Sequence, residues 1–207
     1  MACGICLIML QILNILLRLG TYNINMTNLK KVIRIRNITG LEINKLKLLG
    51  KGTQGRVYRI DSERCIKVFK KSSDCAEETK TLFMGQVDER FPKLYSAGNK
   101  YIIRECINGV ELNKFLSHYQ LTNSISEKIL KLYDAMRKVN FNRLDSTLSH
   151  IFVTSEGNLK LIDTAKALRK KTRRPKLILR GLKKLGYKDD FLNYVKSRRP
   201  DLYSLWN

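Results

Sequence analysis

Apolar and polar residues alternate with a period close to two between residues 41 and 106 of the chain. A period of two places alternate side chains on one face of a strand, whereas steps of three and four residues place them on one face of a helix. We therefore expect short strands here, interrupted by one helix that Asp74 caps. The expected elements are strands 41–49, 57–60 and 65–70, helix 76–85, and a hairpin of strands 91–98 and 100–106 that turns at Gly98 and Asn99.

Beyond Gly109 the apolar residues recur at steps of three and four, which is typical of amphipathic helices. Residues 111–119 predict a short helix, and residues 125–141 predict a long one. The apolar side of the long helix consists of Ile125, Ile129, Leu132, Met136 and Val139. The remaining expected elements are a loop at 143–150, a hairpin over 151–163 that turns at Glu156 and Gly157, and two basic helices within 175–198.

These elements predict an α+β protein with two parts. Residues 43–107 would form a five-stranded antiparallel lobe with one helix, and residues 108–207 a small, mainly helical lobe. A length of 207 residues with 43% hydrophobic residues suits one medium domain or two small lobes around a buried core. The low proline content excludes a collagen-like or broadly disordered chain, since there are only three prolines and no low-complexity tract.

The first 20 residues are strongly apolar, but three polar residues interrupt the run, namely Gln11, Asn14 and Arg18. The run falls short of the roughly 20 apolar residues that a membrane span needs, and it lacks the positive amino end of a signal peptide. We expect residues 1–25 to be an apolar leader, which either precedes a true start at Met26 or forms a weak interfacial helix. The second alternative would give weak membrane association through residues 1–20, and a true span is the third. Residues 26–42 would be an N-terminal extension.

The five cysteines favour a reducing, cytoplasmic location. Cys65, Cys75 and Cys106 lie among apolar or strand-like neighbours, as reduced core cysteines do. Cys3 and Cys6 form a CxxC pair, but the chain has no second such pair and no histidine pair to complete a zinc site.

The chain carries 40 Lys and Arg against 18 Asp and Glu, a net charge of +22, and would attract phosphates, nucleic acid or anionic lipid at low salt. Fourteen basic residues are concentrated near the C-terminus: Lys166, Arg169, Lys170, Lys171, Arg173, Arg174, Lys176, Arg180, Lys183, Lys184, Lys188, Lys196, Arg198 and Arg199. The alternatives are a solvated helical face, a docking surface for an acidic or phosphorylated partner, and a surface for nucleic acid or an anionic membrane. Nucleic acid is not favoured, because no aromatic residues for base stacking are interleaved in the basic run RKKTRRPK.

Three glycines between two expected strands are the first candidate for chemistry. Gly50, Gly52 and Gly55 form a GxGxxG pattern, and Val57 follows it. In a dinucleotide-binding fold this pattern would open a helix, but here strands lie on both sides. A glycine-rich hairpin lets backbone N–H groups approach phosphate oxygens, since no Cβ atoms intervene. The alternative is a plain glycine-rich turn.

A lysine and a glutamate follow at positions that suit an ion pair. Strand periodicity points Lys67 to the same face as Cys65 and Phe69, so an inward lysine would need an anionic partner. Glu78, on the following expected helix, would supply it. The alternative for Lys67 alone is an exposed strand lysine, but the glycine hairpin and Glu78 together favour the inward orientation.

Two aspartates bracket the expected hairpin of residues 151–163. Asp145 lies in the loop after the long helix, and Asp163 ends the second strand. Side chains at these positions can meet at the open end of the hairpin, where one accepts a hydroxyl proton and the other holds Mg²⁺ against phosphate oxygens. The alternative for either aspartate is a turn residue or a helix cap.

The ordered set of these residues resembles the protein-kinase-like superfamily, and the compact size resembles the small bacterial serine/threonine kinases. The resemblance covers roughly residues 43–165. It implies a two-lobed protein-kinase-like fold with a truncated helical C-lobe, and ATP and Mg²⁺ as cofactors. It also implies transfer of the γ-phosphate to a serine, threonine or other hydroxyl. The acceptor stays open among a protein, a small metabolite and a lipid headgroup.

The resemblance further implies a role for each residue. Lys67, paired with Glu78, would hold the α- and β-phosphates, and Asp145 would orient the acceptor hydroxyl and take its proton. Asp163 would bind Mg²⁺, and His150 stands at the position of a second metal ligand, although a neutral imidazole suits this hard cation poorly. The other residues expected at ATP are Leu49, Gly50, Lys51, Gly52, Thr53, Gln54, Gly55 and Val57, with Glu105, Cys106 and Ile107 contacting adenine through their backbone.

Departures from the kinase pattern leave two other functions open. Arg143 and Leu144 precede the catalytic-loop aspartate where His and Arg are typical, and Thr164 and Ala165 stand where Phe and Gly are typical. There is no APE motif, and only 44 residues follow Asp163. The second hypothesis is a pseudokinase that binds nucleotide and acts through partner contacts. The third is a basic nucleic-acid-binding module.

Overall fold

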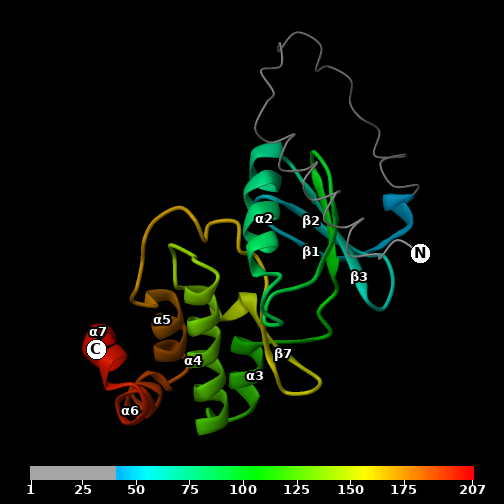
Figure 1. Ribbon diagram of the computed structural model, residues 1–207. Helices are drawn as coiled ribbons and strands as arrows, with labels where there is room; N and C mark the ends of the chain where they lie inside the picture. The colour runs from blue at the N-terminus through cyan, green and yellow to red at the C-terminus, as the bar shows by residue number, and fades with distance from the viewer. Residues whose placement is uncertain (1–40) are drawn as a thin grey trace, which may run out of the picture. The chain divides into compact units, whose positions relative to one another are not determined.

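The computed structural model describes residues 41–207 (Figure 1). The chain divides into two compact units, residues 1–43 and 44–207, and the second holds every strand and α-helix of the described residues. Three features expected from the sequence lie outside that range: the apolar leader 1–25, most of the extension 26–42, and the pair Cys3 and Cys6. Between residues 41 and 207, no helix has both the length and the apolar character needed to cross a membrane.

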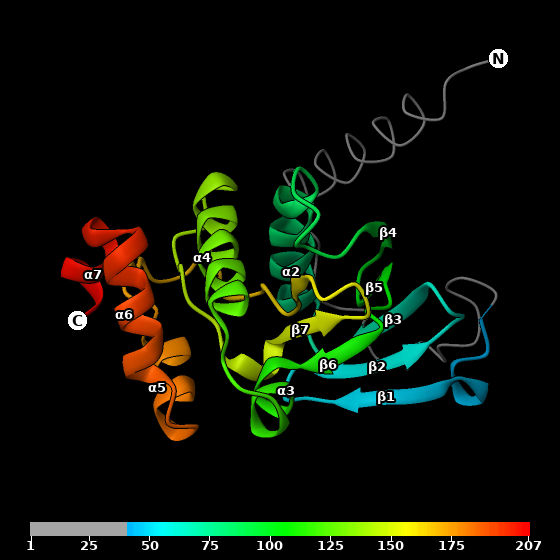
Figure 2. The same ribbon diagram turned by 90° about the horizontal axis from the view of Figure 1, so that it is seen from below.

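A five-stranded antiparallel sheet forms the first part of the second unit (Figures 1 and 2). Its strands are β1 (Lys47–Lys51), β2 (Gly55–Arg59), β3 (Arg64–Phe69), β4 (Leu94–Ala97) and β5 (Tyr101–Glu105), in the order β1-β2-β3-β5-β4. Asp61 closes the β2–β3 turn by accepting hydrogen bonds from the N–H groups of Glu63 and Arg64 (2.9 and 2.7 Å), as turn aspartates do. The predicted α+β class and the five antiparallel strands are confirmed.

The helix α2 (Ser72–Gly85) packs on this sheet. Phe69 of β3 and Ile102 of β5 meet Cys75 and Leu82 of the helix in a small buried core. Apolar contacts therefore join the sheet and α2.

The three inner cysteines are free and buried, as predicted: Cys65, Cys75 and Cys106. The Cys75 thiol donates to the carbonyl oxygen of Gly98 (3.3 Å). Burial raises the pKa of this thiol to about 11, so it stays protonated and behaves as a small core side chain.

Two local predictions are wrong. Asp74 does not cap α2: Lys71 occupies the N-cap position without a side-chain hydrogen bond, and Asp74 lies in the first turn. A negative charge in the first turn still interacts favourably with the helix N-terminus, so acidic residues there do not locate the cap itself. The first strand begins only at Lys47, because Ile43–Lys45 form a 3₁₀ turn. A few alternating residues do not distinguish these two conformations.

The second part of this unit is mainly helical and has a core of its own. Its elements are β6 (Gly109–Glu111), α3 (Leu112–His118), α4 (Asn123–Lys138), the 3₁₀ turn η3 (Leu148–His150), β7 (Ile151–Thr154), β8 (Leu159–Leu161), α5 (Lys176–Lys184), α6 (Lys188–Arg198) and α7 (Pro200–Trp206). The strands β6, β7 and β8 form a small antiparallel sheet in that order. The helix α4 lies between this sheet and the helices α5, α6 and α7 (Figure 2).

The predicted long helix is confirmed as α4. Thr122 Oγ1 accepts a hydrogen bond from the N–H of Ile125 (3.3 Å) and so caps the helix. The predicted apolar stripe is its buried side, together with the residue that follows the helix: Ile125, Ile129, Leu132, Met136 and Val139. The three-residue strand β6 was not predicted, because so short a segment carries too little periodicity.

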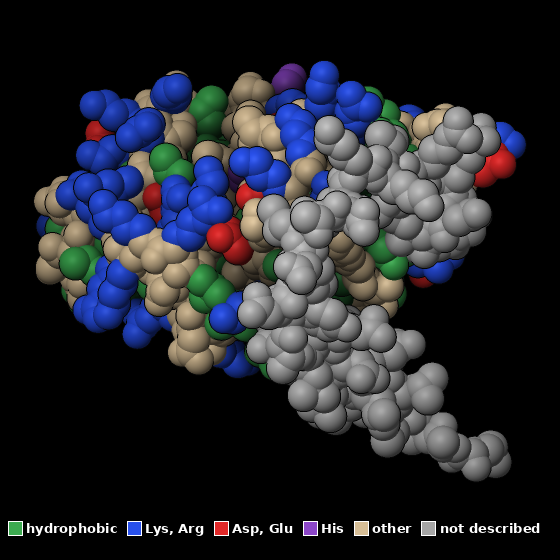
Figure 3. Space-filling model, turned by 90° about the horizontal axis from the view of Figure 1, so that it is seen from above, with side chains coloured by type: hydrophobic (Ala, Val, Ile, Leu, Met, Phe, Trp, Pro, Cys, Tyr) green, Lys and Arg blue, Asp and Glu red, His purple; other side chains and the backbone are tan. Residues whose placement is uncertain are grey.

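The fourteen basic residues between positions 166 and 199 lie at the surface, and none of them is buried. Within the described residues, only Arg169 and Arg199 of this set form ion pairs: Arg169 with Glu77 (2.6 Å), and Arg199 with Asp134 and Asp201 (3.2 and 3.0 Å). Figure 3 shows Lys and Arg gathered over the helical part, at the left of the view, with few Asp or Glu between them. The result is a strongly positive surface on this part of the molecule.

The helix α7 was also not predicted, although Pro200 stands at the favoured first position of a helix. The helix buries Trp206 against Tyr133 of α4 and Phe191 of α6, with ring centroids 4.7 and 6.3 Å apart. This side chain therefore closes the core of the helical part.

Trp206→Ala should lower the free energy of unfolding by about 3–5 kcal/mol, because it removes a fully buried ring and leaves a cavity. Urea denaturation followed by circular dichroism measures the loss. Leu205→Ala is the matched control in the same helix, since Leu205 is 46% exposed, and its effect should stay within about 0.5 kcal/mol. Equal losses for the two variants would contradict this packing of α7.

Candidate functional site

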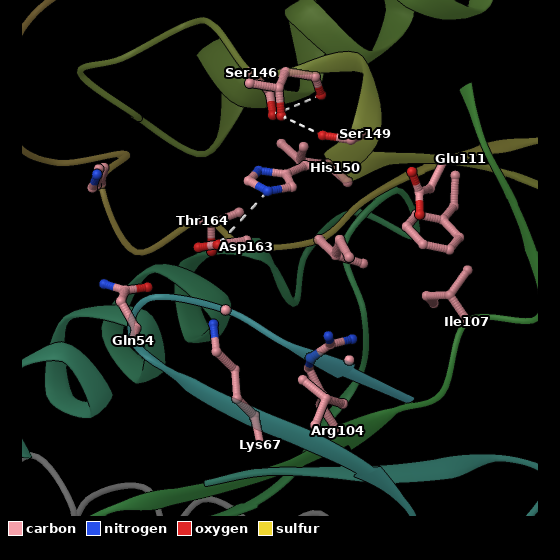
Figure 4. Close-up of a pocket in the computed structure, with 18 of the residues that line it drawn as sticks. Gln54, Lys67, Arg104, Ile107, Glu111, Ser146, Ser149, His150, Asp163 and Thr164 are labelled. Carbon is pink, nitrogen blue, oxygen red and sulfur yellow. Dashed lines mark hydrogen bonds and ion pairs between the residues drawn. The ribbon is translucent and has the colours of Figure 1, made fainter. Parts of the chain in front are cut away.

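A cavity of about 820 Å³ lies where the five-stranded sheet meets the loops that flank β7 and β8 (Figure 4). Its volume is in the range of cavities that hold small ligands, which is about 300–1,000 Å³. It brings together most of the site residues predicted from the sequence: Leu49, Gly50, Lys51, Gly52, Thr53, Gln54, Gly55, Val57, Lys67, Cys106, Ile107, Asp145, His150 and Asp163. Segments more than 100 residues apart in the chain thus share one site.

Strand register determines which side chains of the sheet face this cavity. Directly paired residues of neighbouring strands point to the same face. Two rows of paired residues cross β2, β3 and β5: Val57, Lys67 and Ile102, and next to them Arg59, Cys65 and Arg104. In Figure 4 the side chains of Lys67 and Arg104 rise from the sheet toward the loop that carries His150 and Asp163.

Lys67 and Glu78 form the ion pair that the sequence predicted. Nζ of Lys67 lies 2.5 Å from Oε2 of Glu78, and the two side chains are only 10% and 3% exposed. Nζ also lies 4.8 Å from the centroid of the Phe69 ring. Burial raises the pKa of the Glu78 carboxyl, and the Lys67 ammonium opposes that rise. The lysine is thereby held in one place at the cavity wall.

Removing one charge of this pair should destabilise the protein more than removing both. Glu78→Leu leaves the Lys67 ammonium buried without its carboxylate and should cost about 3–5 kcal/mol of the free energy of unfolding. Adding Lys67→Met should recover most of that loss, because the buried charge is then gone. Urea denaturation of the wild type, the single variant and the double variant gives the comparison. A double variant less stable than Glu78→Leu would show that the two groups are not coupled.

The glycine hairpin closes between β1 and β2, where the N–H of Gly52 donates to the carbonyl oxygen of Gly55 (2.9 Å). Of the three glycines, only Gly55 is required by the packing of the strands. A Cβ atom on Gly55 would collide with the carbonyl oxygen of Val68 in β3. A Cβ atom on Gly50 would meet no described atom within 4 Å, and one on Gly52 would meet only the Gly55 oxygen, at 4.0 Å. Gly50 and Gly52 thus leave open space at the cavity, as close approach of a ligand to the backbone requires.

Alanine should therefore be tolerated at Gly52 but not at Gly55. Gly52→Ala should change the free energy of unfolding by no more than about 0.5 kcal/mol. Gly55→Ala should lower it by about 1–3 kcal/mol, because β3 must move to admit the methyl group. Thermal unfolding of the two variants, measured side by side, tests this difference. Equal stability would mean that β2 and β3 do not pair in this register.

Asp145 lies in the cavity wall, but its carboxylate is hydrogen-bonded to a helix. Oδ1 accepts from the N–H groups of Leu177 (3.1 Å) and Ile178 (3.2 Å), and Oδ2 accepts from that of Leu177 (2.9 Å). Because these are unpaired N–H groups of the first turn of α5, Asp145 acts as a cap from a distant loop. Burial raises the pKa of its carboxyl, and these backbone hydrogen bonds oppose the rise. A carboxylate has about four acceptor sites, and the backbone of Ser146 also interacts with this one, so at most one site is left for a further donor.

Asp163 has a backbone conformation that side chains rarely adopt. Its φ of 58° lies in the left-handed region, which among residues 41–207 only Asn140 shares without being glycine. Such a conformation costs on the order of 1–3 kcal/mol for most residues and clusters at functional sites, and Asp tolerates it better than most. Oδ2 of Asp163 lies 4.0 Å from Nε2 of His150 (Figure 4). Next to it, the hydroxyl of Thr164 is hydrogen-bonded to that of Thr81 in α2 (2.8 Å).

The donor set suits Mg²⁺ only together with phosphate oxygens. No group of three or more His, Cys, Asp or Glu side chains in the described part of the chain is arranged to hold a metal ion. Mg²⁺ is usually bound by one or two carboxylates together with waters and substrate phosphates. Asp163 is the carboxylate that fits this description, since the oxygens of Asp145 are mostly occupied and His150 offers a nitrogen.

Glu105 does not line the cavity, contrary to the prediction. Its carboxylate accepts from Nζ of Lys160 (2.6 and 2.8 Å), and its N–H donates to the carbonyl oxygen of Lys93 (2.8 Å). Its own carbonyl oxygen accepts from Nη1 of Arg104 (3.1 Å). Both backbone groups are therefore engaged, because Glu105 still belongs to the sheet. Ile107 does line the cavity, and its N–H and C=O make no hydrogen bond within residues 41–207.

Arg104 is a cavity residue that the sequence analysis missed. It is 6% exposed, and its Nε has no hydrogen-bond partner in the described part of the chain. The strand pattern could have predicted its burial. Ile102 is buried, and a residue two positions further along a strand lies on the same face. An arginine on a buried face is rare unless it is paired.

Comparisons with known proteins give no family for this chain. No protein-family model matches it, and no curated protein is significantly similar to it. The resemblance of the motifs and the geometry of the cavity are therefore the grounds on which a function can be proposed, and the site carries more weight than the fold.

Proposed function

We propose that the protein is a phosphotransferase of protein-kinase type, which transfers the γ-phosphate of a nucleoside triphosphate to a serine, threonine or other hydroxyl. The observation that carries the proposal is the buried Lys67–Glu78 pair, which shares one cavity wall with the glycine hairpin and faces Asp163. A fixed ammonium beside a hairpin whose Gly50 and Gly52 leave room for close approach to the backbone suits phosphate oxygens. In this proposal the five-stranded sheet with α2 is the N-lobe, and the helical part is the C-lobe. ATP is the nucleotide that the sequence resemblance implies.

In this proposal the residues on each wall of the cavity have a separate role. The backbone of Gly50–Gly55 and the ammonium of Lys67 hold the phosphates. Asp163 would hold Mg²⁺, which would supply neutralisation of the phosphate charge. The remaining acceptor site of Asp145 orients the hydroxyl and takes its proton. The acceptor oxygen forms a bond to the γ-phosphorus while the bond from that phosphorus to the β,γ-bridging oxygen breaks, which leaves the nucleoside diphosphate.

The positive surface of the helical part supports an acidic or phosphorylated protein as the acceptor. Twelve of the fourteen basic residues in this region have no ion-pair partner within residues 41–207. Lys166 and Arg143 extend the positive charge into the cavity lining. A continuous positive surface from the helices to the cavity raises the local concentration of an anionic acceptor.

A second function, nucleotide binding without transfer, is favoured by the hydrogen bonds of Asp145. Its carboxylate is held by the N–H groups of Leu177 and Ile178, and this alone accounts for a buried aspartate at position 145. In that case Asp145 is a helix cap, and the protein acts through partner contacts as a pseudokinase would.

Two substitutions at Asp145 separate the two functions. Asp145→Asn keeps an oxygen that accepts from the backbone of α5, whereas Asp145→Ala removes the cap and should cost about 1–2 kcal/mol of stability. If Asp145 takes the acceptor proton, both variants should lose phosphotransfer by about 100-fold or more. Transfer is measured on the full chain with Mg²⁺, γ-labelled ATP and GTP in parallel assays, and an added acidic protein.

The proposal is supported if the wild type transfers phosphate and Asp145→Asn does not. The Asp145→Asn variant should meanwhile unfold at nearly the same temperature as the wild type. Wild-type protein that binds nucleotide but transfers no more label than Asp145→Asn would contradict it and support the second function. If only Asp145→Ala loses phosphotransfer, and loses it in proportion to its lower stability, then Asp145 is a cap and another group takes the proton.

A further inference from the structure

We propose that Arg104 selects the base of the nucleotide, and that it selects a purine with an oxygen at position 6, so that the protein prefers a guanine nucleotide to ATP. The inference rests on the proposed function, because it assumes that the phosphates lie at the glycine hairpin and Lys67. It concerns the end of the same cavity on the side of Ile107, which Arg104, Cys106 and Ile107 line.

The register of the sheet places Arg104 at that end. Lys67 pairs with Ile102, and Cys65 pairs with Arg104 in the next row, so the two cationic side chains lie on the same face of neighbouring strands. Figure 4 shows both pointing into the cavity, with Arg104 on the side of Ile107. A nucleotide with its phosphates at Lys67 therefore has its base near Arg104.

Arg104 has donors that the described residues do not use. It is 6% exposed, and no carboxylate between residues 41 and 207 lies within ion-pair distance of it. Nη1 donates to the carbonyl oxygen of Glu105 (3.1 Å), whereas Nε is buried without a partner. A buried donor without an acceptor is unfavourable. Nε is not accessible from the cavity, but Nη2 makes no hydrogen bond within residues 41–207 either, so acceptor atoms of a ligand would suit the outer end of this guanidinium and a donor would not.

The two common purines differ in this respect at the edge that carries position 6. Guanine presents O6 and N7, two acceptors side by side, which match the fork of an arginine guanidinium. Adenine presents the N6 amino donor beside N7, so that a donor would meet the donors of Arg104.

The backbone near Arg104 gives the same preference. Glu105 is one of three residues whose backbone the sequence resemblance placed at adenine, but its carbonyl oxygen already accepts from Nη1 of Arg104 and from the thiol of Cys65 (3.6 Å). The adenine amino group would find this acceptor occupied. The free N–H and C=O of Ile107 remain for the other edge of either base, and apolar side chains of Leu49 and Val57 line the cavity for its faces.

Calorimetric titration of the full chain with GTP, ITP and ATP, each with Mg²⁺, tests the inference. ITP shares O6 and N7 with GTP but lacks the 2-amino group, so it isolates the effect of position 6. GTP and ITP should each bind at least roughly 10-fold more tightly than ATP, the factor expected for one matched arginine–base contact. ATP binding as tight as that of GTP and ITP overturns the inference and leaves the proposed function standing. Failure to bind any of the three overturns both.

Two arginine variants assign the preference to one side chain. Arg104→Met is similar in length and has no donors, so it should bring the affinities for GTP and ITP down to that for ATP. Arg59→Met removes the same charge from the cavity lining, from a half-exposed side chain whose Nη2 lies 3.4 Å from Oδ1 of Asn108. It should keep the ratio of the GTP and ATP affinities. Loss of the ratio in Arg59→Met as well would show that charge alone, and not Arg104, sets the preference. Thermal unfolding of both variants confirms that folded proteins are compared.

Discussion

The buried ion pair of Lys67 and Glu78 is the constraint on which the cavity depends. Burying one charge without the other is strongly unfavourable, so the lysine of β3 and the glutamate of α2 must stay within contact distance. This requirement sets the position of α2 against the sheet more narrowly than the small apolar core around Phe69 and Leu82 does, because apolar contacts are not directional. The helix in turn carries Thr81, whose hydroxyl is bonded to that of Thr164, the residue after Asp163. The ion pair on one wall of the cavity is thus linked through α2 to Thr164 on the opposite wall.

The features that the sequence predicted well are those that depend on neighbours along the chain. The short strands between residues 41 and 106 and the stripe of α4 follow from the period of strand and helix, and both are observed, although the first strand begins later than predicted. The inward orientation of Lys67 could be predicted because strand alternation fixes its face and only a few residues of the next helix could reach it. The start of α2 was misjudged at Asp74, since several residues of a first turn satisfy the same charge preference.

The features that the sequence did not predict depend on contacts between distant segments. Asp145 caps a helix that begins 31 residues later in the chain, and no local pattern links the two. Glu105 was expected at the cavity, but its N–H is bonded to the carbonyl oxygen of Lys93, and its carboxylate to the side chain of Lys160 in the other sheet. The burial of Arg104 was readable from alternation, whereas its lack of a partner depends on every element packed around it.

The hydrogen bond between Thr81 and Thr164 has a consequence for how the site responds to its surroundings. It connects α2, which carries Glu78, to the segment that carries Asp163. The two carboxylates repel each other, since the charge of Asp163 contributes to the raised pKa of Glu78. Hydroxyl groups do not change protonation state over the range in which carboxylates do. The link between α2 and the segment after β8 is therefore neutral and indifferent to acidity. The helix α2 is thus held to the two walls of the cavity by two kinds of bond, an ion pair to Lys67 of β3 and a neutral hydrogen bond to Thr164, and protonation of Glu78 acts directly on the first alone.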